Sequence, residues 1–197
     1  MSTRIALPAA IALATALAAA SARADDVEDS VQEAMKAYQG GDYQGAASSL
    51  EYAAQLVRQK RGTVLQTVLP APLAGWTAGD AKAETAAASL FGGMTSAERI
   101  YTKGDATVTV RVVTDSPMLQ GLMAFLTNPA MAAASGVKMQ RIADQKGMIK
   151  YDPATKDGEV TVVVANRFMV TVEGDGADEQ ELVAYAGAVD FKRLAGL

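Results

Sequence analysis

GEVTVVVANRFMVTVEG, residues 158–174, is the stretch that decides the fold. Its valines, threonines and phenylalanine are β-branched or aromatic residues, which favour a pleated, half-buried strand. Asn166 and Arg167 interrupt the run at its middle, and they predict a two-residue hairpin turn because Asn tolerates positive φ. On that register Val163 and Val170 share one face of the hairpin. Both faces are largely apolar, so the hairpin needs neighbouring strands and a covering helix.

Strand patterns continue on both sides of this hairpin. Valines alternate with polar residues at 106–114, which predicts a strand with one buried and one polar face. Residues 178–194 carry acids at their start and bases at their end, as the dipole of a single closing helix favours. Residues 80–94 are Ala-rich and predict a weak helix followed by an irregular segment with a glycine pair. The other predicted strands are 98–102, 137–143 and 147–151.

Two proline-containing pairs predict a helical crossover between the strands. Ser-Pro at 116–117 and Asn-Pro at 128–129 are typical helix starts, because the first residue caps the helix and proline fits its first turn. Met118, Leu122 and Phe125 form an apolar stripe on the first of these helices. The two short helices would therefore cover part of the sheet.

Residues 1–24 predict a secretory signal peptide. Arg4 gives a positive start, 5–20 is an Ala- and Leu-rich apolar run, and 22–24 is a small-x-small cleavage site. The run is too short and too rich in alanine for a membrane span, so we expect no transmembrane segment in the mature chain. The predicted location is the periplasm of a two-membrane bacterium, or beyond it.

Residues 25–69 predict a helical hairpin. No proline interrupts 27–69, apolar residues recur at helical spacing, and the sequence Gly-Gly-Asp at 40–42 breaks the pattern in two. The pattern Gly-Asp-Tyr-x-x-Ala-x-x-x-Leu-x-x-Ala at 41–53 resembles the second half of a tetratricopeptide (TPR) repeat. The match covers about one repeat, and the resemblance implies a hairpin that docks on its own domain or on another protein.

Five residues of the hairpin are candidates for a partner surface. Tyr38 and Tyr43 flank the break between the two helices. Arg58, Lys60 and Arg61 form the only basic cluster in the chain, which is either a solvated helix face or a contact for an acidic partner.

A Pro-rich linker, 70–76, separates the hairpin from a predicted α+β domain at 77–197. Trp76, the sole tryptophan, ends the linker and either pins it to the core or stacks on a ligand. The predicted fold class is α+β, with the helical hairpin followed by an antiparallel sheet covered by helices. This element order resembles the Mog1/PsbP-like class, and the resemblance implies a non-enzymatic accessory or assembly role.

Composition excludes several chemistries. The chain has no His and no Cys, which removes Ser-His-Asp and Cys-His catalysis, the usual zinc and haem ligand sets and thiol redox roles. Removal of residues 1–24 would leave 16 basic and 22 acidic residues, a net charge of −6, which disfavours nucleic acid as a partner. We therefore predict neither an enzyme nor a bound cofactor or metal.

Three hypotheses of function follow. The first is an exported, periplasmic accessory protein that binds an unknown protein partner or itself. The second is a carrier or sensor of an apolar small molecule or lipid, held by Trp76, Met118, Leu122 and Phe125. The third is a Met-based metal site or an enzyme. The metal site is disfavoured because Met118 and Met123, five apart on a helix, do not aim two sulfurs at one point. An enzyme is disfavoured because the chain has no His and no Cys.

Overall fold

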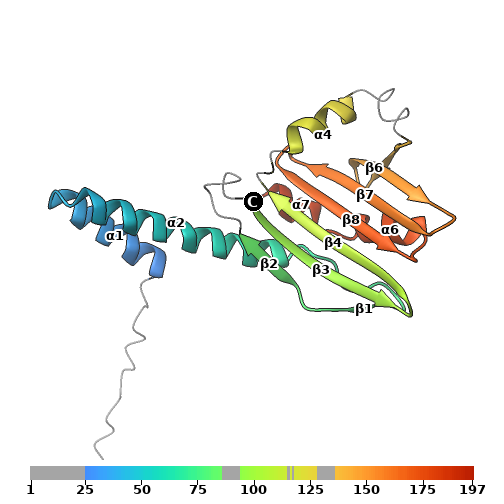
Figure 1. Cartoon of the computed structure of the whole chain (residues 1–197), viewed down its shortest axis with the longest axis horizontal. Helices are drawn as coiled ribbons and strands as arrows, with labels where there is room; N and C mark the ends of the chain where they lie inside the picture. Colours follow the sequence, from blue (N-terminus) through green and yellow to red (C-terminus); the bar gives the residue numbers. More distant parts are fainter. Residues whose placement is uncertain (1–24, 86–93, 115, 117, 128–135) are drawn as a thin grey trace, which may run out of the picture.

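The chain has the predicted α+β fold, in which two N-terminal helices precede a large antiparallel sheet and further helices (Figure 1). A computed structural model describes residues 25–85, 94–114, 116, 118–127 and 136–197, without the side chains of 120 and 124–127. The described helices are α1 (Asp26–Gln39), α2 (Tyr43–Gln66), α4 (Met118–Thr127), α6 (Glu179–Gly187) and α7 (Phe191–Ala195). The described strands are β1 (Thr77–Ala78), β2 (Lys82–Thr85), β3 (Thr95–Lys103), β4 (Ala106–Thr114), β5 (Lys138–Ile142), β6 (Gln145–Asp152), β7 (Asp157–Val164) and β8 (Phe168–Asp175).

The eight described strands form one sheet in the order β1-β3-β4-β8-β7-β6-β5, with β2 also paired to β3. Every pair in it is antiparallel. β7 and β8, the hairpin predicted from the valine-rich stretch, lie between β4 and β6 at the centre. Their backbone N–H and C=O groups therefore face a neighbouring strand on both sides.

The turn of this central hairpin has three residues, 165–167, rather than the predicted two. Ala165 and Asn166 both adopt positive φ there. The extra residue shifts one strand by one position relative to the prediction, and such a shift turns all its side chains to the other face. Val163 and Val170 consequently lie on opposite faces, so the predicted pairing was wrong.

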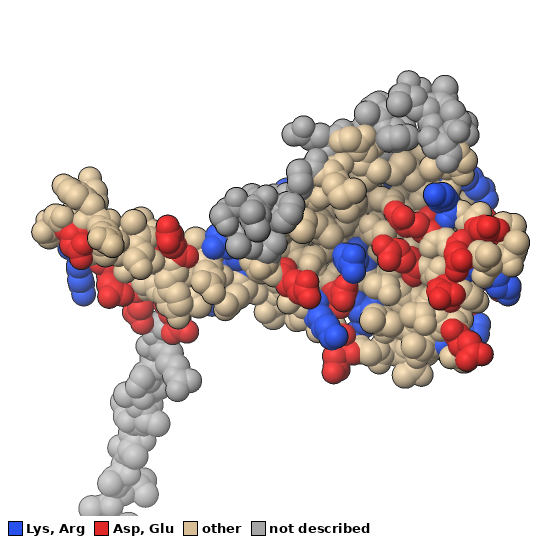
Figure 2. Space-filling model, in the orientation of Figure 1, with Lys and Arg blue, Asp and Glu red and all other residues tan. Residues whose placement is uncertain are grey.

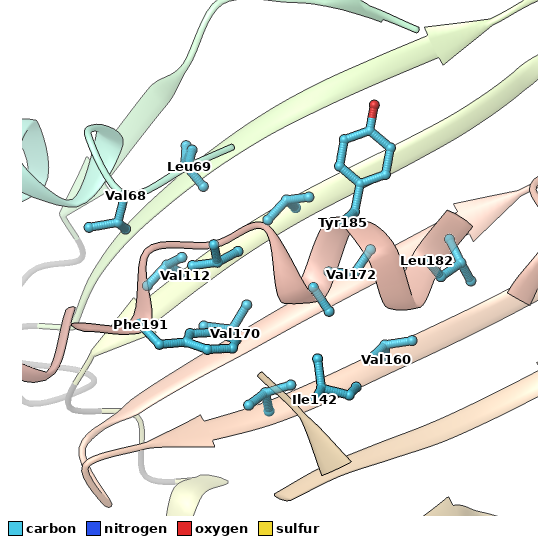
Figure 3. Close-up of a cluster of buried hydrophobic side chains, with 14 of the residues drawn as sticks. Val68, Leu69, Val112, Ile142, Val160, Val170, Val172, Leu182, Tyr185 and Phe191 are labelled. Atoms are coloured by element: carbon cyan, nitrogen blue, oxygen red, sulfur yellow. The ribbon is translucent and has the colours of Figure 1, made fainter. Parts of the chain in front are cut away.

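The observed register gathers the apolar residues on one face, here called the inner face. Its members in the central hairpin are Val160, Val162, Val164, Phe168, Val170 and Val172, each at most 1% exposed. α6 and α7 pack on the inner face and complete the main core through Leu182, Tyr185 and Phe191 (Figure 3). The opposite, outer face carries residues such as Thr161 and Met169.

Two further predictions were wrong. The predicted single C-terminal helix is two helices, α6 and α7. The first ends with its C-cap at Ala188, and the backbone N–H of Asp190 then donates to the Val68 carbonyl at 3.2 Å instead of continuing the helix. Part of the Ala-rich segment 80–94 is the strand β2, since pairing with β3 overrides its weak helix propensity. The glycine pair at 92–93 and the predicted second helix of the crossover, 128–135, lie outside the described residues.

α2 belongs to both parts of the molecule. Its first half pairs with α1 in an arm that projects from the body (Figure 1). Its last turn enters the main core, where Leu65 and, just beyond the helix, Val68 are at most 1% exposed. Gly62 lies where a β-carbon would come within 3.1 Å of Ala83 in β2, so the missing side chain lets helix and sheet approach closely. The arm is therefore rooted in the core through one continuous helix.

A pair of glycines forms a notch for α6. Gly158 in β7 lies opposite Gly174 in β8. A β-carbon at either position would collide with the side chain of Leu182, which is fully buried. The two glycines therefore allow α6 to lie close against the sheet.

Candidate functional site

Large apolar side chains that contact solvent are concentrated on the arm. Among the described residues ten large hydrophobic side chains are exposed, and seven of them lie on α1 and α2. These seven are Val31, Met35, Tyr38, Tyr43, Leu50, Tyr52 and Val57. Exposed apolar side chains that gather in one region often mark an interaction surface, whereas single scattered ones do not. Figure 2 shows the arm extending from the body, with mainly uncharged residues at its far end and charged residues beside them.

Six of the seven side chains form one continuous stripe. On α1, positions 31, 35 and 38 are four and three residues apart, and on α2 positions 43, 50 and 57 are seven apart, so each set lies along one side of its helix. The two stripes meet where the rings of Tyr38 and Tyr43 pack edge to face at 5.6 Å. We call these six residues the hairpin face; Tyr52 points elsewhere because it is two residues from Leu50, about half a helical turn.

Small residues form the contact between the two helices. Ala34, Ala46 and Ala53 are at most 5% exposed and let α1 and α2 approach closely. The helix starts are capped, since Asp25 accepts from the Val27 N–H and Asp42 accepts from the Gly45 N–H. The large apolar residues are thus left to face solvent.

The basic cluster divides between two internal contacts. Lys60 pairs with Asp25 at 2.6 Å and holds the start of α1 against α2, and this hydrogen bond lowers the pKa of Asp25. Arg61 donates to the hydroxyl of Thr114 at the end of β4, at 2.5 Å. Arg58 is partly exposed. Of the five residues proposed from the sequence, only Tyr38 and Tyr43 belong to the hairpin face.

Sequence reasoning did not select Val31, Met35, Leu50 and Val57 as surface residues. Their spacing was visible, but it also fits helices that bury this stripe against each other or against the sheet. Only the structure shows that the helix contact uses alanines instead.

A second candidate site lies on the outer face. A cleft of about 900 Å³ runs beside α4 over β3, β4, β8 and β7. Its apolar end is lined by Met94, Val113, Met118, Leu122 and Met169, and its other end by Glu84, Glu98, Arg111, Glu159 and Glu173. Two of the predicted ligand-lining residues, Met118 and Leu122, are therefore in the cleft, while the Phe125 side chain lies outside the described residues.

Trp76 lies on the other side of the sheet. It is 7% exposed, packs edge to face on Tyr185 at 5.5 Å and donates from Nε1 to Glu181 at 3.2 Å. The sheet separates it from Met118 and Leu122, so these residues do not line one site. Trp76 pins the linker to the core, which is the first of the two roles considered from the sequence.

Methionines are unevenly distributed between the two apolar clusters. The main core contains none of the described methionines. The small cluster between α4 and the outer face contains Met123, Met139, Met148 and Met169. Methionine is unbranched and polarizable, so a surface rich in it adapts readily to an apolar ligand.

Charges at the polar end of the cleft are partly paired. Arg111 donates from Nη2 and Nε to one Glu98 oxygen at 2.7 and 3.0 Å, and this hydrogen bonding raises the pKa of Arg111. Glu159 and Glu173 face each other across β7 and β8. Four carboxylates against one guanidinium disfavour an anionic ligand at this end.

Within the described residues there is no group of three or more acidic side chains placed to hold a metal ion, and no helix there combines the length and apolarity needed to cross a membrane. Comparison of the chain with family models, with curated proteins and with solved structures finds no match.

Proposed function

We propose that this chain is an exported, non-enzymatic accessory protein of the periplasm that binds a protein partner through the hairpin face. The observation that carries the proposal is the gathering of six exposed apolar side chains on one side of a projecting arm. Leaving such a stripe in water forgoes the free energy of its burial, so a partner that covers it gains that energy. The arm's root in the core presents this face on a rigid support.

The test places a photo-crosslinking amino acid at single positions in the full-length chain expressed in cells. Positions 43 and 50 lie on the hairpin face, and position 52 is the matched control on the same helix with similar exposure. We expect defined protein adducts from 43 and 50 and not from 52. Adducts of equal yield from all three positions, or none from the two face positions, would contradict the proposal.

Export is tested separately. If residues 1–24 act as a signal peptide, the mature product begins at Asp25, which is also the N-cap of α1. Intact mass measurement of the product from the periplasmic fraction decides this. A cytoplasmic product that keeps its first 24 residues would contradict the proposed location.

A second candidate function is supported by the methionine-lined cleft. There the chain would act as a carrier or sensor of an apolar small molecule or lipid, with Met118 and Leu122 in contact with it. The carboxylates at the polar end favour a neutral or cationic molecule over an anionic one.

Native mass spectrometry of the protein purified from the periplasm tests this candidate. An added mass of a few hundred daltons that is lost on denaturation would support a carrier, and an added copper ion would instead support a Met-based metal site. The variant Met169→Gln should lose the added mass, whereas Met35→Gln on the arm should keep it. A bare chain in every preparation would refute the carrier.

A further inference from the structure

We propose that the occupant of the hairpin face is the same face of a second copy of this chain, so that two arms pack into a four-helix bundle. This inference rests on the proposed function, because it names the partner that covers the face. It is drawn from the spacing, area, charge and position of the described residues on α1 and α2.

The spacing of the apolar residues fits helix pairing. Tyr43, Leu50 and Val57 recur every seven residues, which is the period of a seam between packed helices. A helix seam of this period is best covered by another helix pair whose apolar residues have the same period. Only one such hairpin occurs in the described chain, so a second copy is the simplest source of that helix pair.

The area of the hairpin face is sufficient for a dimer. Its six side chains are between 39% and 68% exposed. At about 100 Å² for each, they offer roughly 600 Å² per copy and about 1,200 Å² for the pair, which reaches the lower end of stable interfaces. A dimer that exchanges between monomer and dimer in the accessible concentration range is therefore expected.

The charges of the two helices complement each other. α1 has four acids and one base, a net charge of −3, and α2 has one acid and three bases, a net charge of +2. In a pair of arms related by a two-fold axis along the helices, α1 of one copy lies on α2 of the other. Opposite charges then lie along the rim, as the Lys60 and Asp25 pair already does within one arm.

The arm is also accessible to a second copy. It extends away from the sheet and the helices that cover it (Figures 1 and 2). α2 first meets the sheet near Gly62, beyond the last residue of the hairpin face. Two arms can therefore approach each other along most of their length before the bodies come into contact.

Sedimentation equilibrium of the protein purified from the periplasm, over a wide concentration range, tests the inference. We expect a mass that rises from one chain to two. Leu50→Lys places a charge in the centre of the face, and because the dimer carries it twice, its dissociation constant should rise on the order of a hundredfold. Tyr52→Lys, with the same charge on the same helix but off the face, should leave the dissociation constant within about threefold.

Each outcome decides the matter. A wild-type mass of one chain at all concentrations, or a dimer that Leu50→Lys does not weaken, overturns the inference. A far-UV circular dichroism spectrum and melting curve like those of the wild type show that Leu50→Lys has folded. If it has not, Tyr43→Lys near the tip of the arm takes its place with the same expectation.

Failure of the inference is distinguishable from failure of the proposed function. Self-crosslinked chains from positions 43 and 50 support both. A monomeric protein whose face positions crosslink to a different protein overturns the second copy but keeps the hairpin face as a binding surface. A monomeric protein with no adducts at these positions refutes both.

Discussion

Two leucines of α2 should respond very differently to the same substitution. Leu65 is fully buried in the main core, whereas Leu50 is 53% exposed on the arm. Leu65→Ala should lower the free energy of unfolding by about 2 to 5 kcal/mol, because it removes buried methyl groups and leaves a cavity. Leu50→Ala should change it by less than about 0.5 kcal/mol in the monomer, because its side chain already contacts water.

Urea denaturation followed by tryptophan fluorescence measures both changes. Trp76 is the sole tryptophan and is buried against Tyr185, so its emission reports unfolding of the core. Measurements at the lowest protein concentration that fluorescence allows keep the chain monomeric. A loss of more than about 1.5 kcal/mol for Leu50→Ala would show that this side chain is buried within the monomer, which would refute the exposed hairpin face. A negligible loss for Leu65→Ala would refute the rooting of α2 in the core.

Three further predictions use the same assay. Gly174→Ala should cost about 1 to 3 kcal/mol because its β-carbon collides with Leu182, and the cost should shrink in a Leu182→Ala background. Burial raises the pKa of Tyr101 to about 12, so the neutral phenol stabilises the fold fully below about pH 10. This stabilisation is lost as the pH rises to about 12, and in Tyr101→Phe the free energy of unfolding should fall less over the same range. Burial opposes ionisation of Glu181, but hydrogen bonds from Lys103, the Asp178 backbone and the Trp76 indole outweigh it and lower the pKa of Glu181. The ionised carboxylate therefore stabilises the fold above the ordinary pKa of glutamate, and this stabilisation is lost as the pH falls. Lys103→Met should reduce this loss of stability in acid by less than about 1 kcal/mol.

The sequence predicted the strand and helix content well where residue type and period agree. The valines of β4, β7 and β8 predicted strands that pair at the centre of the sheet, and the Gly-rich break at 40–41 predicted the turn between α1 and α2. The register of the central hairpin was mispredicted because Ala165, which has little turn preference, joins Asn166 in the left-handed region. One residue in the turn was enough to exchange the faces of a strand.

The sites were harder to predict because they depend on which of two apolar surfaces is covered. Met118 and Leu122 line a cleft, but the sheet separates Trp76 from them. On the arm, alanines form the contact between the helices, and the tyrosines and Leu50 are exposed. The helical period alone does not predict which of these two sets is buried. The resemblances to a TPR repeat and to Mog1/PsbP-like proteins stay predictions.

The continuity of α2 has a mechanical consequence. From Tyr43 to Arg61 it is an uninterrupted helix of about 28 Å at 1.5 Å per residue, and Arg61 near its base donates a hydrogen bond to Thr114. Thr114 is two residues from Ser116, which lines the cleft. A tilt of the helix at its tip exerts torque at its base, where the strand that leads to the cleft is attached. The helix that carries half of the hairpin face therefore ends beside a strand that lines the cleft.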